Sequence, residues 1–162
     1  VKRLEENCAR MRLANRLKIV GSSLEMFQQD TKDLFDRILV DAPCSGLGVI
    51  RRRPDLRWNR TEKDLKQFQK KQLFLLETAA AMTAANGIVA YITCSTEPEE
   101  NERVVEKFLS HHPEFSLENA KNALPASAAA LVDDNGFFRT IPNEKGLDGF
   151  FGARLIKSND GT

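Results

Sequence analysis

The chain has 162 residues, a formal net charge of +1 and an apolar fraction of 41%. This length suits one domain, and the composition argues against wholesale disorder because it supplies enough apolar side chains for a packed core. No apolar run reaches the roughly 18 residues that a membrane span needs, and no apolar stretch of the signal-peptide kind follows the first basic pair, so no membrane partner is expected.

The first part of the chain alternates helical and strand patterns. Apolar residues at helical spacing predict a helix over residues 1–15, with an apolar face formed by Leu4, Cys8 and Met11. A short strand is expected over 17–20. A second strand is expected over 36–41, where the Ile-Leu-Val run is typical of a strand buried on both faces. A loop rich in Pro, Gly and Arg then covers 42–60.

A long helix and a third strand follow this loop. The helix is expected over 61–85, and Asn86-Gly87 marks its end. The apolar run at 88–94 predicts a strand. Another helix is expected over 98–112, because acidic residues crowd its first turn, where the helix dipole favours negative charge.

The end of the chain is expected to form a hairpin. Strand-like segments at 136–141 and 149–156 flank the sequence Asn143-Glu144-Lys145-Gly146. Strands that alternate with helices imply an α/β fold with a mostly parallel sheet, here with an antiparallel C-terminal hairpin at its edge. We expect one domain over 1–157, followed by a flexible tail over 158–162.

Two short segments carry the residues most suited to chemistry. They are Asp41-Ala42-Pro43-Cys44-Ser45-Gly46 and Thr93-Cys94-Ser95, at the ends of two predicted strands. Functional groups collect beyond the carboxyl ends of strands in such a sheet, so Cys44 and Cys94 are expected near one cleft. A thiol reacts as the thiolate, which the dipole of the helix after Cys94 favours. The alternative is that each cysteine is a small buried hydrophobe.

The third cysteine, Cys8, makes the number of cysteines odd. This usage fits reduced thiols and a cytoplasmic protein better than a disulfide framework. No C-x-x-C pair is present, and the two histidines, His111 and His112, are adjacent, so no metal site is expected.

Positive charge gathers in the segment after Cys44. Residues 51–71 include nine basic and three acidic residues, which gives a local charge of +6. Such a patch suits a phosphate backbone. The candidate RNA contacts are three successive residues on the loop that leaves Cys44, namely Arg51, Arg52 and Arg53. The basic residues of 63–71 are interpreted as a solvated helix face, and Trp58 as a core anchor rather than a platform for a stacked base.

Several segments, in a fixed order, resemble one known family. They are DRILVDAPCSG at 36–46, GVIRRRPD at 48–55, YITCST at 91–96 followed by EENE at 99–102, and DGFF at 148–151. Their order and spacing together are specific, and the likeness extends over most of the chain. The chain resembles the Sun-type (RsmB/Fmu-like) RNA cytosine-5 methyltransferases, and among them those of bacterial ribosomal RNA.

The resemblance implies a Rossmann-like class I methyltransferase fold and a mechanism with two cysteines. Cys94 is implied to be the nucleophile that adds to carbon 6 of cytosine, so that carbon 5 can take a methyl group, and Cys44 to assist release. Asp41 is implied to contact ring nitrogen 3, and Pro43 to fix the loop so that Cys44 faces the cleft. The alternatives are a turn carboxylate for Asp41 and an ordinary turn proline for Pro43.

The resemblance also implies S-adenosylmethionine as cofactor, with Asp41 and Pro43 among its contacts. The family binds it with a glycine-rich loop after its first strand and an acidic residue after its second, and neither is found in the sequence. The expected fold therefore lacks its N-terminal strands. Gly21-Ser22-Ser23 stands where the family tends to carry a further acidic residue, so Ser22 is the substitute candidate. We expect a partial catalytic domain that binds cofactor weakly or not at all and is inactive alone.

RNA is the expected partner, ribosomal rather than transfer RNA, and an exposed sheet edge is expected to let two copies pair. Other interpretations stay open. An amino-methyltransferase would carry Asp/Asn-Pro-Pro-aromatic in place of residues 41–44 and would need no cysteine. A non-catalytic module would bind RNA through the arginine loop alone. A thiol-redox enzyme would carry a C-x-x-C pair.

Overall fold

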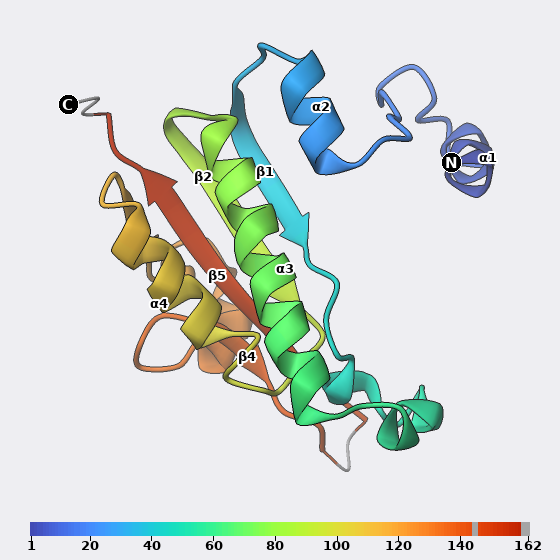
Figure 1. Ribbon diagram of the computed structural model, residues 1–162, viewed down its shortest axis with the longest axis vertical. Helices are drawn as coiled ribbons and strands as arrows, with labels where there is room; N and C mark the ends of the chain where they lie inside the picture. Colours follow the sequence, from blue (N-terminus) through green and yellow to red (C-terminus); the bar gives the residue numbers. More distant parts are fainter. Residues whose placement is uncertain (144–145, 160–162) are drawn as a thin grey trace. The chain divides into compact units, whose positions relative to one another are not determined.

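The computed structural model describes residues 1–143 and 146–159. The chain forms two compact units, the first spanning Val1–Asp33 and the second beginning at Leu34. Figure 1 shows the helices and strands of each unit. None of the described helices is long and apolar enough to cross a membrane.

The first unit begins with helix α1 (Lys2–Arg10). This helix ends earlier than predicted because Arg12 adopts a left-handed backbone, with φ of 57°, which breaks the helical path. Within α1, the buried part of the predicted apolar face is Cys8. The helix therefore contributes a single buried side chain rather than a broad apolar stripe.

The second half of this unit differs from the prediction. The strand predicted over 17–20 is wrong, because this segment has no ladder partner among the described residues and a strand exists only through such pairing. Instead the structure contains a short helix, α2 (Leu24–Asp30), that was absent from the prediction. Ser23 caps α2 by accepting a hydrogen bond from a backbone amide of its first turn at 3.3 Å.

The second unit is built on a five-stranded sheet with the order β1-β2-β5-β3, and β4 also pairs with β5. The strands are β1 (Phe35–Asp41), β2 (Thr83–Thr93), β3 (Phe115–Glu118), β4 (Phe138–Thr140) and β5 (Phe150–Lys157). β1 and β2 are parallel, whereas β5 runs antiparallel to β2, β3 and β4. The sheet is therefore parallel in direction apart from β5, which confirms the predicted α/β fold.

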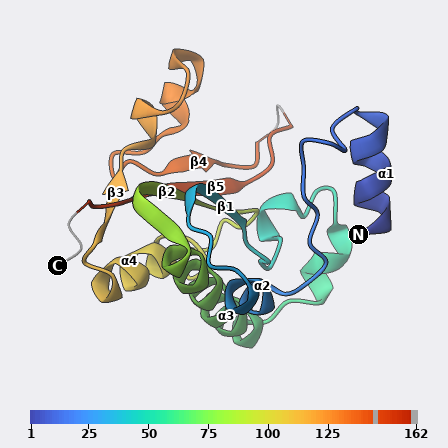
Figure 2. The ribbon, with the colours of Figure 1, turned by 90° about the horizontal axis from the view of Figure 1, so that it is seen from above.

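Two helices, α3 (Glu62–Ala81) and α4 (Glu102–His111), lie on the same face of this sheet (Figure 2). Thr61 and Asp64 start α3 with a capping box, in which each side chain accepts a hydrogen bond from the backbone amide of the other. α4 begins later than predicted because residues 98–101 form turns. The core between helices and sheet includes residues that are at most 1% exposed: Leu76, Val89, Tyr91, Val104, Phe108, Phe151 and Leu155.

β1 and β2 correct two expectations. β1 is not buried on both faces: Val40 packs in the core, but Leu39, which points to the opposite face, is 66% exposed. β2 begins at Thr83, so α3 is shorter than predicted. The Asn86-Gly87 pair lies inside β2 as an irregularity, because Asn86 has a left-handed φ of 58° and the register to β1 shifts there.

The C-terminal part of the chain contains more structure than expected. The antiparallel pairing of β4 with β5 confirms the predicted strand pair. Its predicted place at the edge of the sheet is wrong, because β5 pairs with β2 on one side and β3 on the other. β3 and two 3-10 turns, Ala120–Asn122 and Ala126–Leu131, were absent from the prediction. Residues 144–145 of the expected hairpin loop and 160–162 of the expected tail lie outside the described residues.

Candidate active site

The carboxyl ends of β1 and β2 bring Cys44 and Cys94 together. The amide of Ala42 donates to the carbonyl of Ile92 at 3.0 Å, which extends the parallel pairing past the end of β1. Beyond it the two Sγ atoms lie 2.8 Å apart, and the Cys94 amide donates to Cys44 Sγ at 3.3 Å. Both cysteines are free thiols and half-buried. The prediction that these thiols lie close together is confirmed.

The two thiols differ in proton affinity. The hydrogen bond from Cys44 lowers the pKa of Cys94 to about 7, against the opposing effects of burial and of the charges on Asp41 and Glu100. The same hydrogen bond, together with burial, raises the pKa of Cys44. Cys44 therefore keeps its proton and donates a hydrogen bond to the thiolate form of Cys94, which is the form that a nucleophile requires.

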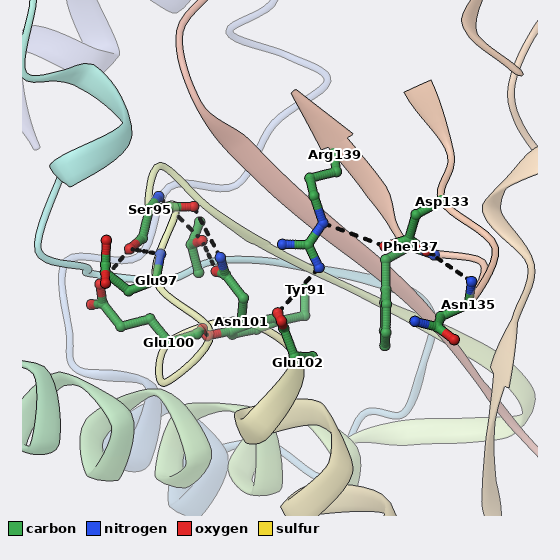
Figure 3. A network of polar contacts seen from close by, with 11 residues as sticks. Tyr91, Ser95, Glu97, Glu100, Asn101, Glu102, Asp133, Asn135, Phe137 and Arg139 are labelled. Atoms are coloured by element: carbon green, nitrogen blue, oxygen red, sulfur yellow. Dashed lines mark hydrogen bonds and ion pairs between the residues drawn. The ribbon is translucent and has the colours of Figure 1, made fainter. Parts of the chain in front are cut away.

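A buried carboxylate joins the two cysteine loops. Glu100 is 0% exposed and accepts from the hydroxyl groups of Ser45 and Ser95, each at 2.5 Å. Its other oxygen accepts from the amide of Ser45 at 2.8 Å and from a buried glutamine side chain of α3 at 3.0 Å. Figure 3 shows the contact between Ser95 and Glu100. Because the two serines directly follow the two cysteines, one side chain ties both loops.

Asp41 and Pro43 lie at the end of β1, and both are exposed. Among the residues that the structure describes, no hydrogen bond or ion pair engages the Asp41 carboxylate. Its charge opposes ionisation of Cys94. The carbonyl of Pro43 accepts from the side chain of Gln72 at 3.0 Å, which ties the loop to α3. The Asp41 carboxylate is therefore accessible to a ligand beside the thiol pair.

The loop after Cys44 also contacts the C-terminal hairpin. The amide of Gly48 donates to the carbonyl of Cys94 at 3.0 Å, and the amide of Gly149 donates to the carbonyl of Gly48 at 2.7 Å. A Cβ atom on Gly48 would lie 2.1 Å from the carbonyl oxygen of Gly149, so this close approach requires glycine. Three segments distant in the sequence meet at this one backbone position.

Comparison with known proteins identifies the family. Residues 1–156 match the model of the family described as 16S rRNA methyltransferase RsmB/F. The chain belongs to this family. Over 97% of its length it is 38% identical to ribosomal RNA small subunit methyltransferase B of Pasteurella multocida. Over 96% it is 35% identical to the probable ribosomal RNA small subunit methyltransferase B of Coxiella burnetii. It spans about a third of these relatives, 34% and 35% of their lengths.

The fold of this RsmB/F family member matches that of a solved relative. The crystal structure of NSun6 from Pyrococcus horikoshii, determined with SFG, superposes with a TM-score of 0.79 at 28% sequence identity. The match covers 98% of the chain and 39% of that protein. The likeness supports the Rossmann-like methyltransferase fold expected from the sequence.

The three candidate arginines of this RsmB/F family member reach solvent but also make contacts within the chain. Arg51 donates to the carbonyl of Gly146 at 2.8 Å. Arg52 Nε lies 2.7 Å from a carboxylate oxygen of Asp148, a side chain that is only 7% exposed. Arg53 faces an exposed acidic residue of its own loop at 3.7 Å. Arg52 thus combines an exposed guanidinium with a buried partner.

The interpretation of Trp58 as a core anchor is wrong. Trp58 is 84% exposed at the end of the 3-10 turn Pro54–Trp58, whose buried apolar side chain is Leu56. The same loop is anchored beside the thiols, because Arg60 Nε donates to the carbonyl of Ser45 at 2.8 Å. An exposed indole among arginines suits a stacked base.

Ser22 belongs to the first compact unit, not to the unit that holds the thiols. There it lines a hollow of about 430 Å³ with Lys18, Val20 and Phe27. The neighbouring Ser23, rather than Ser22, caps α2. A cofactor contact at Ser22 stays a prediction.

Glu100 is the residue of this site that sequence reasoning did not single out. In the sequence it belongs to EENE at 99–102, one of the segments that carry the family resemblance, but the sequence predicts no role for it, because each carboxylate there is equally consistent with a solvated helix start. The serine after each cysteine is a second signal, since buried hydroxyl donors need acceptors. Only the structure shows that Glu100 is that acceptor.

Proposed function

We propose that the chain supplies the thiol pair of an RNA methyltransferase that uses S-adenosylmethionine to methylate carbon 5 of a cytosine in ribosomal RNA. The observation that carries this proposal is the 2.8 Å approach of two free thiols at the carboxyl ends of parallel strands. Membership of the RsmB/F family supports the class of reaction. The chain spans about a third of the length of its curated relatives. The activity is therefore proposed for a protein of the relatives' length that contains this chain, not for the chain alone.

Cys94 acts first in the proposed mechanism. Its thiolate adds to carbon 6 of cytosine, and the new S–C bond shifts an electron pair of the ring toward carbon 5 and nitrogen 3. Nitrogen 3 takes up a proton from solvent, and the Asp41 carboxylate, exposed beside the thiols, accepts a hydrogen bond from the resulting N–H and so offsets the charge that accumulates there. S-adenosylmethionine, when bound, supplies an electrophilic methyl group for carbon 5.

Cys44 acts in release. After the carbon 5 proton has passed to solvent, the S–C bond breaks and its electron pair returns to the sulfur of Cys94. The Cys44 thiol, 2.8 Å from that sulfur, donates a hydrogen bond to the departing thiolate. The contact that lowers the pKa of Cys94 therefore also makes it a better leaving group.

The residues at the end of β1 fit a cofactor in part. Asp41 offers a carboxylate with no partner among the described side chains, and Pro43 is exposed beside it. We propose both as contacts at the methyl donor. Ser22 is proposed separately, by itself, as a cofactor contact. The NSun6 structure determined with SFG supports a ligand of this kind in the family.

RNA is the proposed partner, and the loop of residues 51–60 is its proposed contact. Arg51, Arg52 and Arg53 suit phosphates, and Trp58 suits a stacked base. Ribosomal rather than transfer RNA is proposed because the curated relatives carry the name ribosomal RNA small subunit methyltransferase B. The target cytosine must leave its stack, because Cys94 has to approach over the face of the ring.

Two further proposals concern the whole protein. β1 is the outer strand of the described strand order, and its outer edge is proposed to pair with a second copy. Sedimentation that stays monomeric across protein concentrations would count against such pairing. A cytoplasmic location is proposed because all three cysteines are free thiols.

The test is a covalent trap. A protein of the relatives' length that carries Cys44→Ala is incubated with RNA and S-adenosylmethionine, because loss of the release group should leave Cys94 attached to cytosine. We expect a slowly migrating protein–RNA adduct on a denaturing gel that disappears in the Cys44→Ala, Cys94→Ala double variant.

The outcomes separate the competing functions. Methyl transfer that survives loss of Cys94 would favour an amino-methyltransferase. RNA binding without adduct or methyl transfer in any variant would favour a non-catalytic RNA-binding module.

A further inference from the structure

Glu100 is a charged residue in an unusual position, because its side chain is completely buried. Burial of a carboxylate is strongly unfavourable unless hydrogen bonds replace its water. Four donors do so here: the Ser45 amide, the Gln72 side-chain amide and the hydroxyl groups of Ser45 and Ser95. Two donors reach each oxygen, which matches the acceptor capacity of an ionised carboxylate.

The donors come from three different segments. Ser45 belongs to the loop after β1, Ser95 to the loop after β2 and Gln72 to α3. Gln72 is itself 0% exposed, and its amide also donates to the carbonyl of Pro43. Glu100 therefore fastens both cysteine loops to one rigid helix.

The segment that carries Glu100 is itself fixed to β2. The hydroxyl of buried Tyr91 donates to the backbone carbonyl of Glu100 at 2.6 Å. The side chain of Asn101 accepts from the Thr93 hydroxyl at 2.6 Å and donates to the carbonyl of Ser95 at 3.0 Å. Figure 3 shows Tyr91, Ser95, Glu100 and Asn101 gathered around the turn after β2. The carboxylate thus has little freedom to move with one loop away from the other.

We propose that Glu100 is the positioning residue that sets the separation of the Cys44 and Cys94 sulfur atoms. The consequence of this positioning for methyl transfer rests on the proposed function, but the effect of Glu100 on the two thiols does not. Glu100 makes no hydrogen bond to either sulfur atom. It acts through its hydrogen bonds to Ser45 and Ser95, and each of these serines directly follows one of the cysteines in the sequence.

This role can be told apart from a purely electrostatic one because the two predict opposite signs. The hydrogen bond from Cys44 is the main cause that lowers the pKa of Cys94, whereas the negative charges of Asp41 and Glu100 raise it. Removing only a charge would lower the pKa of Cys94 further. Removing the hydrogen bonds that hold the two cysteine loops together would separate the sulfur atoms and so raise the pKa of Cys94.

The experiment is an ultraviolet titration of the thiolate in the full chain with Cys8→Ala, so that the two site thiols are observed alone. We expect Glu100→Ala to raise the pKa of Cys94 and Glu100→Gln, which keeps the shape and most hydrogen bonds, not to raise it. Glu102→Gln is the matched control, since Glu102 pairs with Arg139 away from the thiols. An unchanged or lowered pKa in Glu100→Ala would overturn the proposal.

A second measurement follows the distance itself. Oxidised glutathione forms a mixed disulfide with Cys94 and releases one glutathione thiolate, and Cys44 then displaces the second glutathione to close a Cys44–Cys94 disulfide. We expect ring closure to slow by about tenfold or more in Glu100→Ala, because reaction within a pair depends steeply on alignment. Unaltered closure would overturn the proposal.

If Glu100→Ala does not fold by circular dichroism, Ser45→Ala and Ser95→Ala remove one attachment each and are expected to show the same direction of change. Unaltered closure and pKa in both serine variants would overturn the proposal. Neither assay uses RNA or S-adenosylmethionine. Failure of the methyltransferase assignment would therefore leave these results unchanged.

Discussion

Arg52 Nε lies 2.7 Å from a carboxylate oxygen of Asp148, and the two residues differ greatly in exposure: the arginine side chain is 68% exposed and the aspartate 7%. The second oxygen of Asp148 has no hydrogen-bond partner in the described part of the chain. The ion pair therefore links a loop proposed to contact RNA to a buried residue of the C-terminal hairpin.

Arg52→Ala is expected to lower the free energy of unfolding by about 1–3 kcal/mol, because it leaves a buried acceptor without its donor. Arg53→Ala is the control, since its pair at 3.7 Å is exposed on both sides and contributes little. Both variants should reduce the salt dependence of RNA affinity by about one unit of slope. Equal stability of the two variants in urea titrations would contradict the structural role of Arg52.

Gly48→Ala is expected to destabilise the protein by about 1–3 kcal/mol, as overpacked sites do, because its Cβ would collide with backbone. Gly152→Ala is the matched control: a Cβ there would meet Phe138 at 3.5 Å, an ordinary contact distance. Denaturant midpoints of the two variants give the comparison. A Gly48→Ala midpoint equal to that of Gly152→Ala would show that the backbone relaxes freely.

Alkylation of Cys94 by iodoacetamide is expected to be half-maximal near pH 7, the value of its lowered pKa. The thiolate fraction rises as pH increases through that value and falls below it. Cys44→Ala removes the hydrogen bond that lowers the pKa, so the midpoint should move upward toward the ordinary value of 9.0. A midpoint that stays in place would show that the pair does not share a proton.

Trp58→Ala is expected to weaken single-stranded RNA binding by about 1–3 kcal/mol, the usual range for a stacked base. Stability should not change, because Trp58 is 84% exposed. Trp58→Phe keeps an aromatic face and should retain most of the affinity. Loss of stability without loss of affinity in Trp58→Ala would instead indicate a packing role.

Regular structure with strong local patterns could be predicted from the sequence. The Ile-Leu-Val run of β1 and the Thr61 start of α3 lie where local pattern and capping place them. The meeting of Cys44 and Cys94 also follows, because parallel neighbours end at the same edge of a sheet. These features depend on a few adjacent residues or on one topological rule.

Features decided by tertiary contact could not be predicted in this way. The strand expected over 17–20 has a suitable pattern but no partner in the described structure. Trp58 is exposed because Leu56 fills the inward position of the same turn. Both side chains are apolar, and nothing in the sequence shows which of them will be buried. The burial of Glu100 requires donors from three segments, which no local pattern reveals.

The backbone joint at Gly48 has a consequence for synthesis on the ribosome. Its two hydrogen bonds need Cys94 and Gly149, so both can form only after residue 149 has emerged from the ribosome. Domains form as units while translation proceeds from the N-terminus. A nascent chain that already contains both thiols but lacks Gly149 cannot form the hydrogen bond from Gly149 to Gly48 that holds the loop after Cys44. We expect protease to cleave that loop readily in chains arrested before Gly149 and slowly in chains extended well beyond it, so the loop becomes protected only once the C-terminal hairpin has been made.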